Sequence, residues 1–258
     1  MNKTDQHKHL TRRAIKTQLH YAESDIGFET AREIISVKIA NARMILTDFR
    51  QARARAGFEH AGKIESIVAR IRRFEKEARR VERRESLFRI EAFAAKAYWD
   101  AVRLIARRPA LWRRKYPGSP DSFNTVLNGG YRLLASRSMQ AIQKAGLLPE
   151  IGVLHGEHSR DGLVYDFMEC FRHPLVDAVV LPLFSRRNFG ASLNEKSEGR
   201  AFGIIDGMYK KRFWYRGRCE KMARILDFEA IKLRKAMMDK KLWKVYRHRW
   251  GHRNRCSP

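Results

Sequence analysis

The apolar residues between positions 28 and 49 recur at intervals of three and four, and this spacing constrains the fold more than any other feature of the sequence. They are Ile34, Ile35, Ile39, Met44, Ile45 and Phe49. Such a repeat places these side chains on one face of a helix, which is then buried against other elements. The same spacing recurs over residues 64–81, where arginines fill the other faces. We therefore expect two long amphipathic helices, the second basic on its outer side.

Four further helices are predicted from the same kind of pattern. They cover about residues 85–106, 121–145, 162–183 and 206–241. Ser119 followed by Pro120 is a typical helix start, with a capping hydroxyl and a proline at the first helical position. Residues 186–203 are polar and contain glycine, which is typical of an exposed connection. Because no block is rich in strand patterns, the predicted fold class is all-α.

The predicted organisation has three parts. A basic N-terminal segment covers residues 1–25, a helical domain covers residues 26–242, and a basic, aromatic tail covers residues 243–258. The tail interleaves aromatic side chains with cations and lacks a clean helical period. Two interpretations of the tail stay open: a loose arm that binds nucleic acid, and a packed terminal helix.

The charge of the chain is strongly positive and is spread along its whole length. Lysine and arginine number 54 against 28 acidic residues, a net charge of +26. A polyanion is therefore the expected partner. Nucleic acid fits better than a membrane, because no apolar run is long enough to span a bilayer and the N-terminus does not resemble a signal peptide. We expect a cytoplasmic protein without a membrane partner.

The cysteines give no sign of a structural role. Cys170, Cys219 and Cys256 lie far apart and form no C-x-x-C pair. Neither a disulfide framework nor a thiolate zinc site is indicated, and we expect reduced thiols.

Glu91 occupies an unusual position for an acid. In the predicted helix 85–106 it falls within the stripe that includes Leu87, Ala94 and Tyr98. An unpaired charge on a buried face is costly, so this carboxylate requires an arginine partner, a proton or a bound cation. The residues alone leave a structural ion pair and a metal or catalytic role equally open.

A second group of titratable residues lies in the segment 152–174. His155 follows an apolar stretch, and Asp166 and Glu169 share the polar side of the predicted helix 162–183. Taken singly, a backbone-bonded histidine and a solvated helix face are the ordinary interpretations. Taken together with Glu91, a histidine and two or three carboxylates suit magnesium or manganese. Zinc is disfavoured because no third nitrogen or sulfur ligand is evident.

No other catalytic pattern is present in the sequence. We find no nucleophilic triad and no glycine-rich phosphate loop, since "LNGGYRLL" matches neither known pattern. With these patterns excluded, the remaining reaction class is metal-assisted phosphoryl chemistry on nucleic acid.

Four segments of the chain resemble a known family. In order, they are "AREIISVKIANARMIL", "RIEAFAAKAYW", "PDSFNTVLNGGYRLL" and "AGLLPEIGVLHGEHSRDGLVYDFMECFRHPLVD". Their order and spacing resemble the CRISPR-associated protein 1 family, the integrase of spacer acquisition, over about residues 10–245. The resemblance implies an all-α catalytic domain whose metal, Mg²⁺ or Mn²⁺, is held by Glu91, His155 and Glu169. Asp166 matches the family's other acid and would support or complete the site.

Further positions are expected to support the site or contact DNA. They are Asn124, Tyr131, Arg172, Arg113, Arg114, Lys210, Lys211 and Arg212. Asn124, Tyr131 and Arg172 match family positions, although Asn124 could equally be a helix-start residue and Tyr131 a core residue. Basic helices are expected to bind backbone phosphates, with an affinity that falls steeply with salt.

The resemblance also implies a reaction and partners. The 3′ hydroxyl of a DNA end would attack a phosphodiester in the repeat target, which inserts a spacer by transesterification; water in its place would give nuclease activity. The expected partner is double-stranded DNA, as prespacer and as repeat target, bound by a homodimer or higher homo-oligomer.

The sequence departs from the family pattern in several places. The N-terminal β-domain of the family is largely absent from the match, so the small partner of the family, CRISPR-associated protein 2, stays open as a partner. Ala92 and Cys170 replace a usual glycine and proline. Two alternative functions stay open: a transposon-type integrase that uses the same residues, and a non-catalytic DNA-binding assembly subunit.

Overall fold

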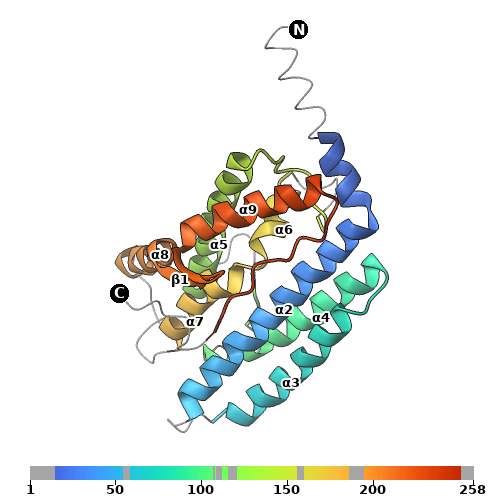
Figure 1. Cartoon of the computed structure of the whole chain (residues 1–258). Coiled ribbons are helices and arrows are strands. Elements are labelled where there is room, and N and C mark those ends of the chain that lie inside the picture. Colours follow the sequence, from blue (N-terminus) through green and yellow to red (C-terminus); the bar gives the residue numbers. More distant parts are fainter. Residues whose placement is uncertain are drawn as a thin grey trace, which may run out of the picture.

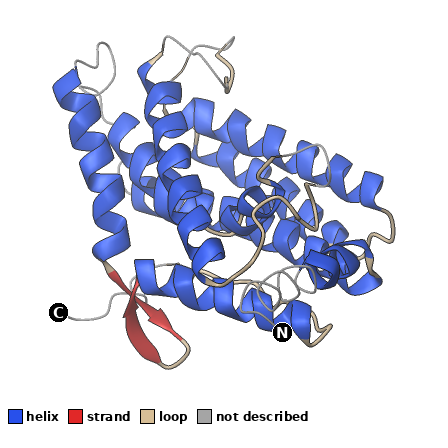
Figure 2. Ribbon diagram, turned by 90° about the horizontal axis from the view of Figure 1, so that it is seen from above, coloured by secondary structure: helices blue, strands red, loops and turns tan. Residues whose placement is uncertain are grey.

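The described part of the molecule is a helical body with one small β-hairpin (Figures 1 and 2). The computed structural model describes residues 15–54, 59–106, 108, 112–115, 121–155, 160–185 and 195–250. Residues 15–23 are helical and lead into the first labelled element. The elements that follow are α2 (Asp25–Ala54), α3 (Ala61–Ala78), α4 (Arg84–Ile105), α5 (Ser122–Lys144), α6 (Gly162–Met168), the π-helical turn η1 (His173–Asp177), α7 (Ala178–Phe184), α8 (Glu195–Lys210), β1 (Arg212–Tyr215), β2 (Arg218–Lys221) and α9 (Met222–Met238). The predicted all-α class is confirmed.

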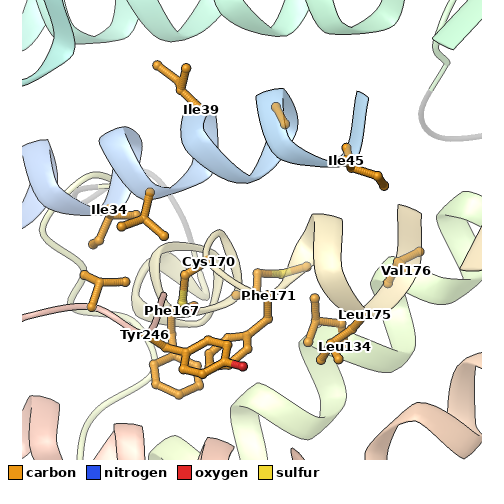
Figure 3. Close-up of a cluster of buried hydrophobic side chains, with 14 of the residues drawn as sticks. Ile34, Ile39, Ile45, Leu134, Phe167, Cys170, Phe171, Leu175, Val176 and Tyr246 are labelled. Atoms are coloured by element: carbon orange, nitrogen blue, oxygen red, sulfur yellow. Dashed lines mark hydrogen bonds between the residues drawn. The ribbon is translucent and has the colours of Figure 1, made fainter. Parts of the chain in front are cut away.

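The helices form two groups that share α2 as their border. Helices α2, α3 and α4 pack together, and α5 packs against α6, α7, α8 and α9 (Figure 1). The apolar face of α2 closes the core from above, and Ile34 reaches toward Phe167, Phe171 and Tyr246 (Figure 3). The strong apolar period of residues 28–49 therefore predicts correctly the helix that joins the two groups.

A hairpin interrupts the predicted helix 206–241, so that prediction is wrong. Strand β1 pairs with β2 in antiparallel register, with Phe213 opposite Glu220. Arg216 and Gly217 adopt φ angles of 48° and 87°, the left-handed values that a two-residue hairpin turn requires. The hairpin lies at the periphery of the helical body (Figure 2). The local signal was an Arg-Gly pair between two aromatic or polar runs, which the basic composition of the segment concealed.

The predicted helix 162–183 is also divided, and its interruption has a definite cause. Pro174 has no N–H, so it cannot donate to the carbonyl of Cys170 four residues earlier. The Asn41 side chain of α2 uses that carbonyl instead, with Nδ2 donating to the Cys170 oxygen at 2.9 Å. The chain widens into the π-helical turn at this point, and such turns are frequent at functional sites.

Two further boundaries differ from the predicted ones. The start of α5 is capped by Asp121, whose Oδ1 accepts from the Asn124 N–H at 3.0 Å; the expected cap at Ser119 lies outside the described residues. The expected connection 186–203 overlaps the first half of α8, because residues 195–203 are helical. Residues 186–194 lie outside the described part.

The C-terminal segment 241–250 is extended and packed, so it is neither a loose arm nor a helix. It runs back beside α2 (Figure 1). Trp243 is buried and stacks on Phe167 with ring centroids 5.8 Å apart. Trp250 donates from Nε1 to Asn41 Oδ1 at 3.1 Å. The aromatic residues of the predicted tail therefore complete the core, while residues 251–258 lie outside the described part.

The cysteines differ in state. Cys170 is free and buried beneath α2, as expected. Cys219 is disulfide-bonded, so the expectation of reduced thiols is wrong for this residue, because the lack of a C-x-x-C pair does not exclude a disulfide. None of the described helices combines the length and the apolar character needed to cross a membrane.

Candidate active site

A lysine joins the two glutamates that the sequence singled out. Lys38 Nζ of α2 lies 2.5 Å from Glu91 Oε1 of α4 and 2.9 Å from Glu169 Oε2 at the end of α6. The Lys38 side chain is 16% exposed, so this contact is largely sheltered from water. Three elements from different parts of the chain thus meet at one ammonium group.

The neighbouring charges keep Lys38 and Glu169 ionised. Burial disfavours the Lys38 ammonium, but Glu169 and Glu91 outweigh that effect and raise its pKa. Burial likewise disfavours the Glu169 carboxylate, but Arg172 and Lys38 outweigh it and lower its pKa to about 2. A buried carboxylate that stays charged can bind a cation.

Arg172 covers the other side of Glu169. Its guanidinium lies 3.2 Å from Glu169 Oε1 and 5.2 Å from the ring centroid of Tyr131. Arg172 lies in the turn between α6 and η1, so the interruption caused by Pro174 helps to place it. Arg172 thus lies between Glu169 and Tyr131, and the site-supporting role of Tyr131 and Arg172 stays a prediction.

His155 is oriented by Asp166. Asp166 is fully buried; its Oδ1 lies 2.6 Å from His155 Nδ1 and accepts from the His155 backbone N–H at 3.1 Å. Its Oδ2 accepts from the N–H groups of Val153 and Leu154 at 2.5 and 2.9 Å. The hydrogen bond to Asp166 raises the pKa of His155, and burial opposes the rise. Both oxygens of Asp166 therefore accept hydrogen bonds that hold the loop and the imidazole ring. Nε2 of that ring stays available for other contacts.

Two glycines allow the loop to approach α6 so closely. A Cβ atom at Gly152 would lie 2.5 Å from Asp166 Oδ2 and 2.7 Å from the Gly162 backbone. A Cβ atom at Gly162 would lie 2.2 Å from the His155 carbonyl oxygen. Any other residue at these two positions would push His155 away from Asp166.

A cavity of about 450 Å³ opens beside Lys38 and Glu91. Its walls include the cations Arg114, Arg132 and Arg172 and the aromatic ring of Trp99. A cavity with several cations and aromatic faces suits an anion that carries a ring, such as a nucleotide.

A buried acid of η1 bonds to two tyrosines that line this cavity. Asp177 accepts hydrogen bonds from the hydroxyl groups of Tyr98 at 2.6 Å and Tyr131 at 2.5 Å. His173 Nε2 lies 3.8 Å from the same carboxylate, and burial lowers the pKa of His173 to about 4. The neutral His173 is thus a packing residue of the cavity wall.

The residues present are of the types that bind a hard divalent cation, although they do not form a complete coordination site. Among the residues that the structure describes, no three histidine, cysteine, aspartate or glutamate side chains already form a metal-binding group. The donors nevertheless suit Mg²⁺ or Mn²⁺: two carboxylates face one cation, and the neighbouring imidazole is oriented by a carboxylate. The cation that both carboxylates contact in this structure is the ammonium of Lys38.

Other predicted positions lie apart from the carboxylate pair. Asn124 is buried at the start of α5, where its Oδ1 accepts from Arg114 at 2.8 Å and from the Lys115 N–H at 3.1 Å. Arg114 lies against the cavity, whereas Arg113 is exposed. Lys210, Lys211 and Arg212 are exposed where α8 meets the hairpin. Their contacts with DNA stay predictions.

Sequence reasoning missed Lys38, Asn41 and Asp177. Lys38 and Asn41 fall on the same helical stripe as Ile34 and Ile45, so polar residues on an apolar face were the available signal. Glu91 carried the same signal and was recognised, but its partner is this lysine rather than the arginine that the composition suggested. Asp177 gave no comparable signal. It lies three residues after Pro174, where the regular helical spacing is interrupted.

Comparison with known proteins identifies the family. The family model described as "CRISPR associated protein Cas1" matches residues 3–214. This chain belongs to the Cas1 family. It is 32% identical over 216 residues to a CRISPR-associated endonuclease Cas1 of Archaeoglobus fulgidus, a match that covers 74% of this chain and 63% of the relative. A second relative, the CRISPR-associated endonuclease Cas1 of Hyperthermus butylicus, is 33% identical over 58% of this chain and 45% of its own length. This Cas1 chain therefore spans less than two thirds of these relatives.

Solved structures agree with the fold of this Cas1 chain. A casposase bound to an integration product superimposes with a TM-score of 0.71 at 22% identity and covers 90% of this chain and 70% of that one. A CAS1 protein from Thermotoga maritima gives a TM-score of 0.66 at 22% identity, over 87% of this chain and 70% of that one. At these identities the likeness establishes the helical fold alone.

Proposed function

We propose that this Cas1 chain is a divalent-metal-dependent DNA integrase and endonuclease that inserts short DNA fragments into a CRISPR array. The observation that carries the proposal is the meeting of Glu91 and Glu169 on one cation, with His155 close by and a cation-lined cavity alongside. The names of the curated relatives, CRISPR-associated endonucleases, support the nuclease part. The casposase described with its integration product supports the integrase part.

Glu91, His155 and Glu169 would hold Mg²⁺ or Mn²⁺. When bound, the cation supplies Lewis-acid polarisation of a phosphodiester oxygen and neutralises charge that builds up on phosphorus. The chain's own residues do the remaining work. Asp166 fixes the His155 ring, so that Nε2 stays directed away from the carboxylate that orients it.

Cations of the cavity would bind the phosphate groups. Arg172 and Arg114 lie within 5.5 Å of the Tyr131 ring centroid, which keeps both guanidinium groups beside the cavity. Fixed positive groups of this kind stabilise negative charge without reorganisation during the reaction. A DNA 3′ hydroxyl would then attack the target phosphorus in line and give up its proton. The bond from phosphorus to the 3′ oxygen of the target strand would break, and that oxygen would leave as a new 3′ hydroxyl, so no nucleophilic side chain of the protein is required.

The proposed partners follow from charge and family. The net charge of +26 suits double-stranded DNA, both as the fragment and as the repeat target. Two neighbours in structure are described as complexes of Cas6-RT-Cas1 with Cas2, and we propose a homo-oligomer that assembles with a Cas2 protein in the cytoplasm.

A strand-transfer assay tests this function. The purified protein is mixed with a short duplex that has free 3′ hydroxyls, a plasmid that carries a repeat, and Mg²⁺ or Mn²⁺. We expect Glu91→Ala, His155→Ala and Glu169→Ala each to lower strand transfer by about 100-fold or more, while Glu85→Ala, an exposed acid on the same helix as Glu91, leaves it unchanged. Undiminished transfer in the first three variants would refute the site.

The same assay separates the alternative functions. Equal insertion into plasmids with and without the repeat would favour a transposon-type integrase. DNA binding without joining, under either metal and with Cas2 added, would favour a non-catalytic assembly subunit.

A further inference from the structure

We infer that Lys38 is a built-in cation that competes with the divalent metal for Glu91 and Glu169, so that metal binding requires the lysine to move into the neighbouring cavity. This inference rests on the proposed function, because it concerns the proposed metal site. It adds a residue that the metal-ligand pattern does not contain.

The first argument is the geometry of the shared position. Lys38 Nζ lies 2.5 Å from one carboxylate and 2.9 Å from the other. A hard metal ion held by these two carboxylates would use the same oxygens that contact the ammonium. The ammonium and the metal therefore exclude one another.

The second argument is charge. The two carboxylates at the site are matched by two cations, Lys38 and Arg172, which both contact Glu169. A metal entering this balanced group would meet two positive charges in a place that water screens poorly. Removal of the ammonium from between the carboxylates lowers that repulsion and returns both oxygens to the metal.

The third argument is the space available to the side chain. Lys38 and Glu91 both line the cavity of about 450 Å³. Lysine carries its charge on a flexible four-carbon stem, so its ammonium can leave the carboxylates while the backbone of α2 stays in place. Once displaced, the ammonium would join Arg114 and Arg132 on the cavity wall, where a phosphate group of DNA would enter.

The physical consequence is that Lys38 weakens metal binding and stabilises the metal-free protein. It keeps two carboxylates together that would otherwise repel one another in a sheltered site. A neutral side chain at position 38 therefore leaves a pair of carboxylates that only a metal can neutralise.

Metal affinity without DNA tests the inference. Mn²⁺ binding is measured by titration calorimetry, or from the electron paramagnetic resonance signal of free Mn²⁺, for wild type, Lys38→Met, Lys38→Gln and Lys38→Arg. We expect Lys38→Met and Lys38→Gln to bind Mn²⁺ at least about tenfold more tightly than wild type, and Lys38→Arg to show no such gain. The matched control is Lys96→Met, which removes one exposed lysine from α4 and leaves the affinity unchanged. Equal or weaker binding by folded Lys38→Met and Lys38→Gln would overturn the inference.

A second measurement uses the wild-type chain and therefore does not depend on how the variants fold. Lysine acylation is followed by mass spectrometry with and without Mn²⁺. We expect labelling of Lys38 to rise several-fold when Mn²⁺ is added, while labelling of Lys96 stays constant. Unchanged or lower labelling of Lys38 would overturn the inference.

These results are independent of strand transfer. A tight-binding Lys38→Met protein in a chain that never joins DNA would uphold the competition and refute the integrase proposal. Strand transfer that depends on Glu91 and Glu169, together with an unchanged affinity in Lys38→Met, would do the reverse.

Discussion

The two halves of the site are built in different ways. Glu91 and Lys38 project from long, regular helices that apolar packing holds in place. His155, Asp166 and Glu169 lie on a loop and a seven-residue helix, where buried polar groups take over the positioning. Apolar packing positions Glu91, so this acid is not needed to hold its helix in place. Asp166, on the irregular side, is needed for the fold itself, because its carboxylate holds the loop of His155.

The largest effect is expected at Asp166, which is the centre of the irregular half. Asp166→Asn removes a buried charge that accepts from three backbone N–H groups and orients His155. We expect the free energy of unfolding to fall by about 4 kcal/mol, as measured by urea denaturation.

The control for this change is Asp161→Asn in the same segment. Asp161 stands at the N-cap of α6 without a side-chain capping bond, so the same chemical change there is expected to have little effect on stability. Similar losses in the two variants would contradict the assigned role of Asp166.

The next effect concerns pH and His173. The pKa of His173 falls from 6.5 to about 4 because burial disfavours its charged form. Between these two values the unfolded chain binds a proton that the folded chain does not, so stability is complete above pH 6.5 and is lost as the pH falls toward the folded pKa. The expected loss from this residue is about 3 kcal/mol, and His173→Phe should flatten the dependence of unfolding free energy on pH between 4 and 6.5.

His155 provides the internal contrast to this pH effect. Asp166 raises the pKa of His155, so its contribution to stability is present below its unfolded pKa and is lost as the pH rises through its folded pKa. The two histidines can be followed separately by NMR titration. An acid slope that is identical in wild type and His173→Phe would show that the burial of His173 does not control the acid response.

The smallest effect on stability is expected in the regular half. Glu91→Gln breaks an ion pair whose glutamate side chain is 20% exposed, while the apolar stripe of α4 stays intact. Lys38 keeps Glu169 as its partner in this variant, so no buried charge is left unpaired. We expect the free energy of unfolding to fall by only about 1 kcal/mol, even though the same substitution should abolish strand transfer. A loss as large as that of Asp166→Asn would remove the distinction between the two halves.

Much of the fold followed from the sequence, because helix formation depends on local spacing. The periods of α2, α3, α4 and α5 predicted those helices within a few residues. The predictions failed where a local pattern was overruled: Pro174 divided the helix 162–183, and Arg216 with Gly217 turned a basic segment into a hairpin. The C-terminal segment gave no periodic signal, since Trp243 and Tyr246 are buried by an extended chain.

The sequence by itself determined the fold class, the positive charge and the candidate acids Glu91, Asp166 and Glu169. Only the tertiary structure decided how these acids differ: Asp166 supports the loop, whereas Glu91 and Glu169 meet at Lys38. The physical reason is that the cost of a buried charge can be read from its position on a helix, whereas the group that compensates it comes from a distant part of the chain. Packing alone brings α2, α4 and the end of α6 to one point.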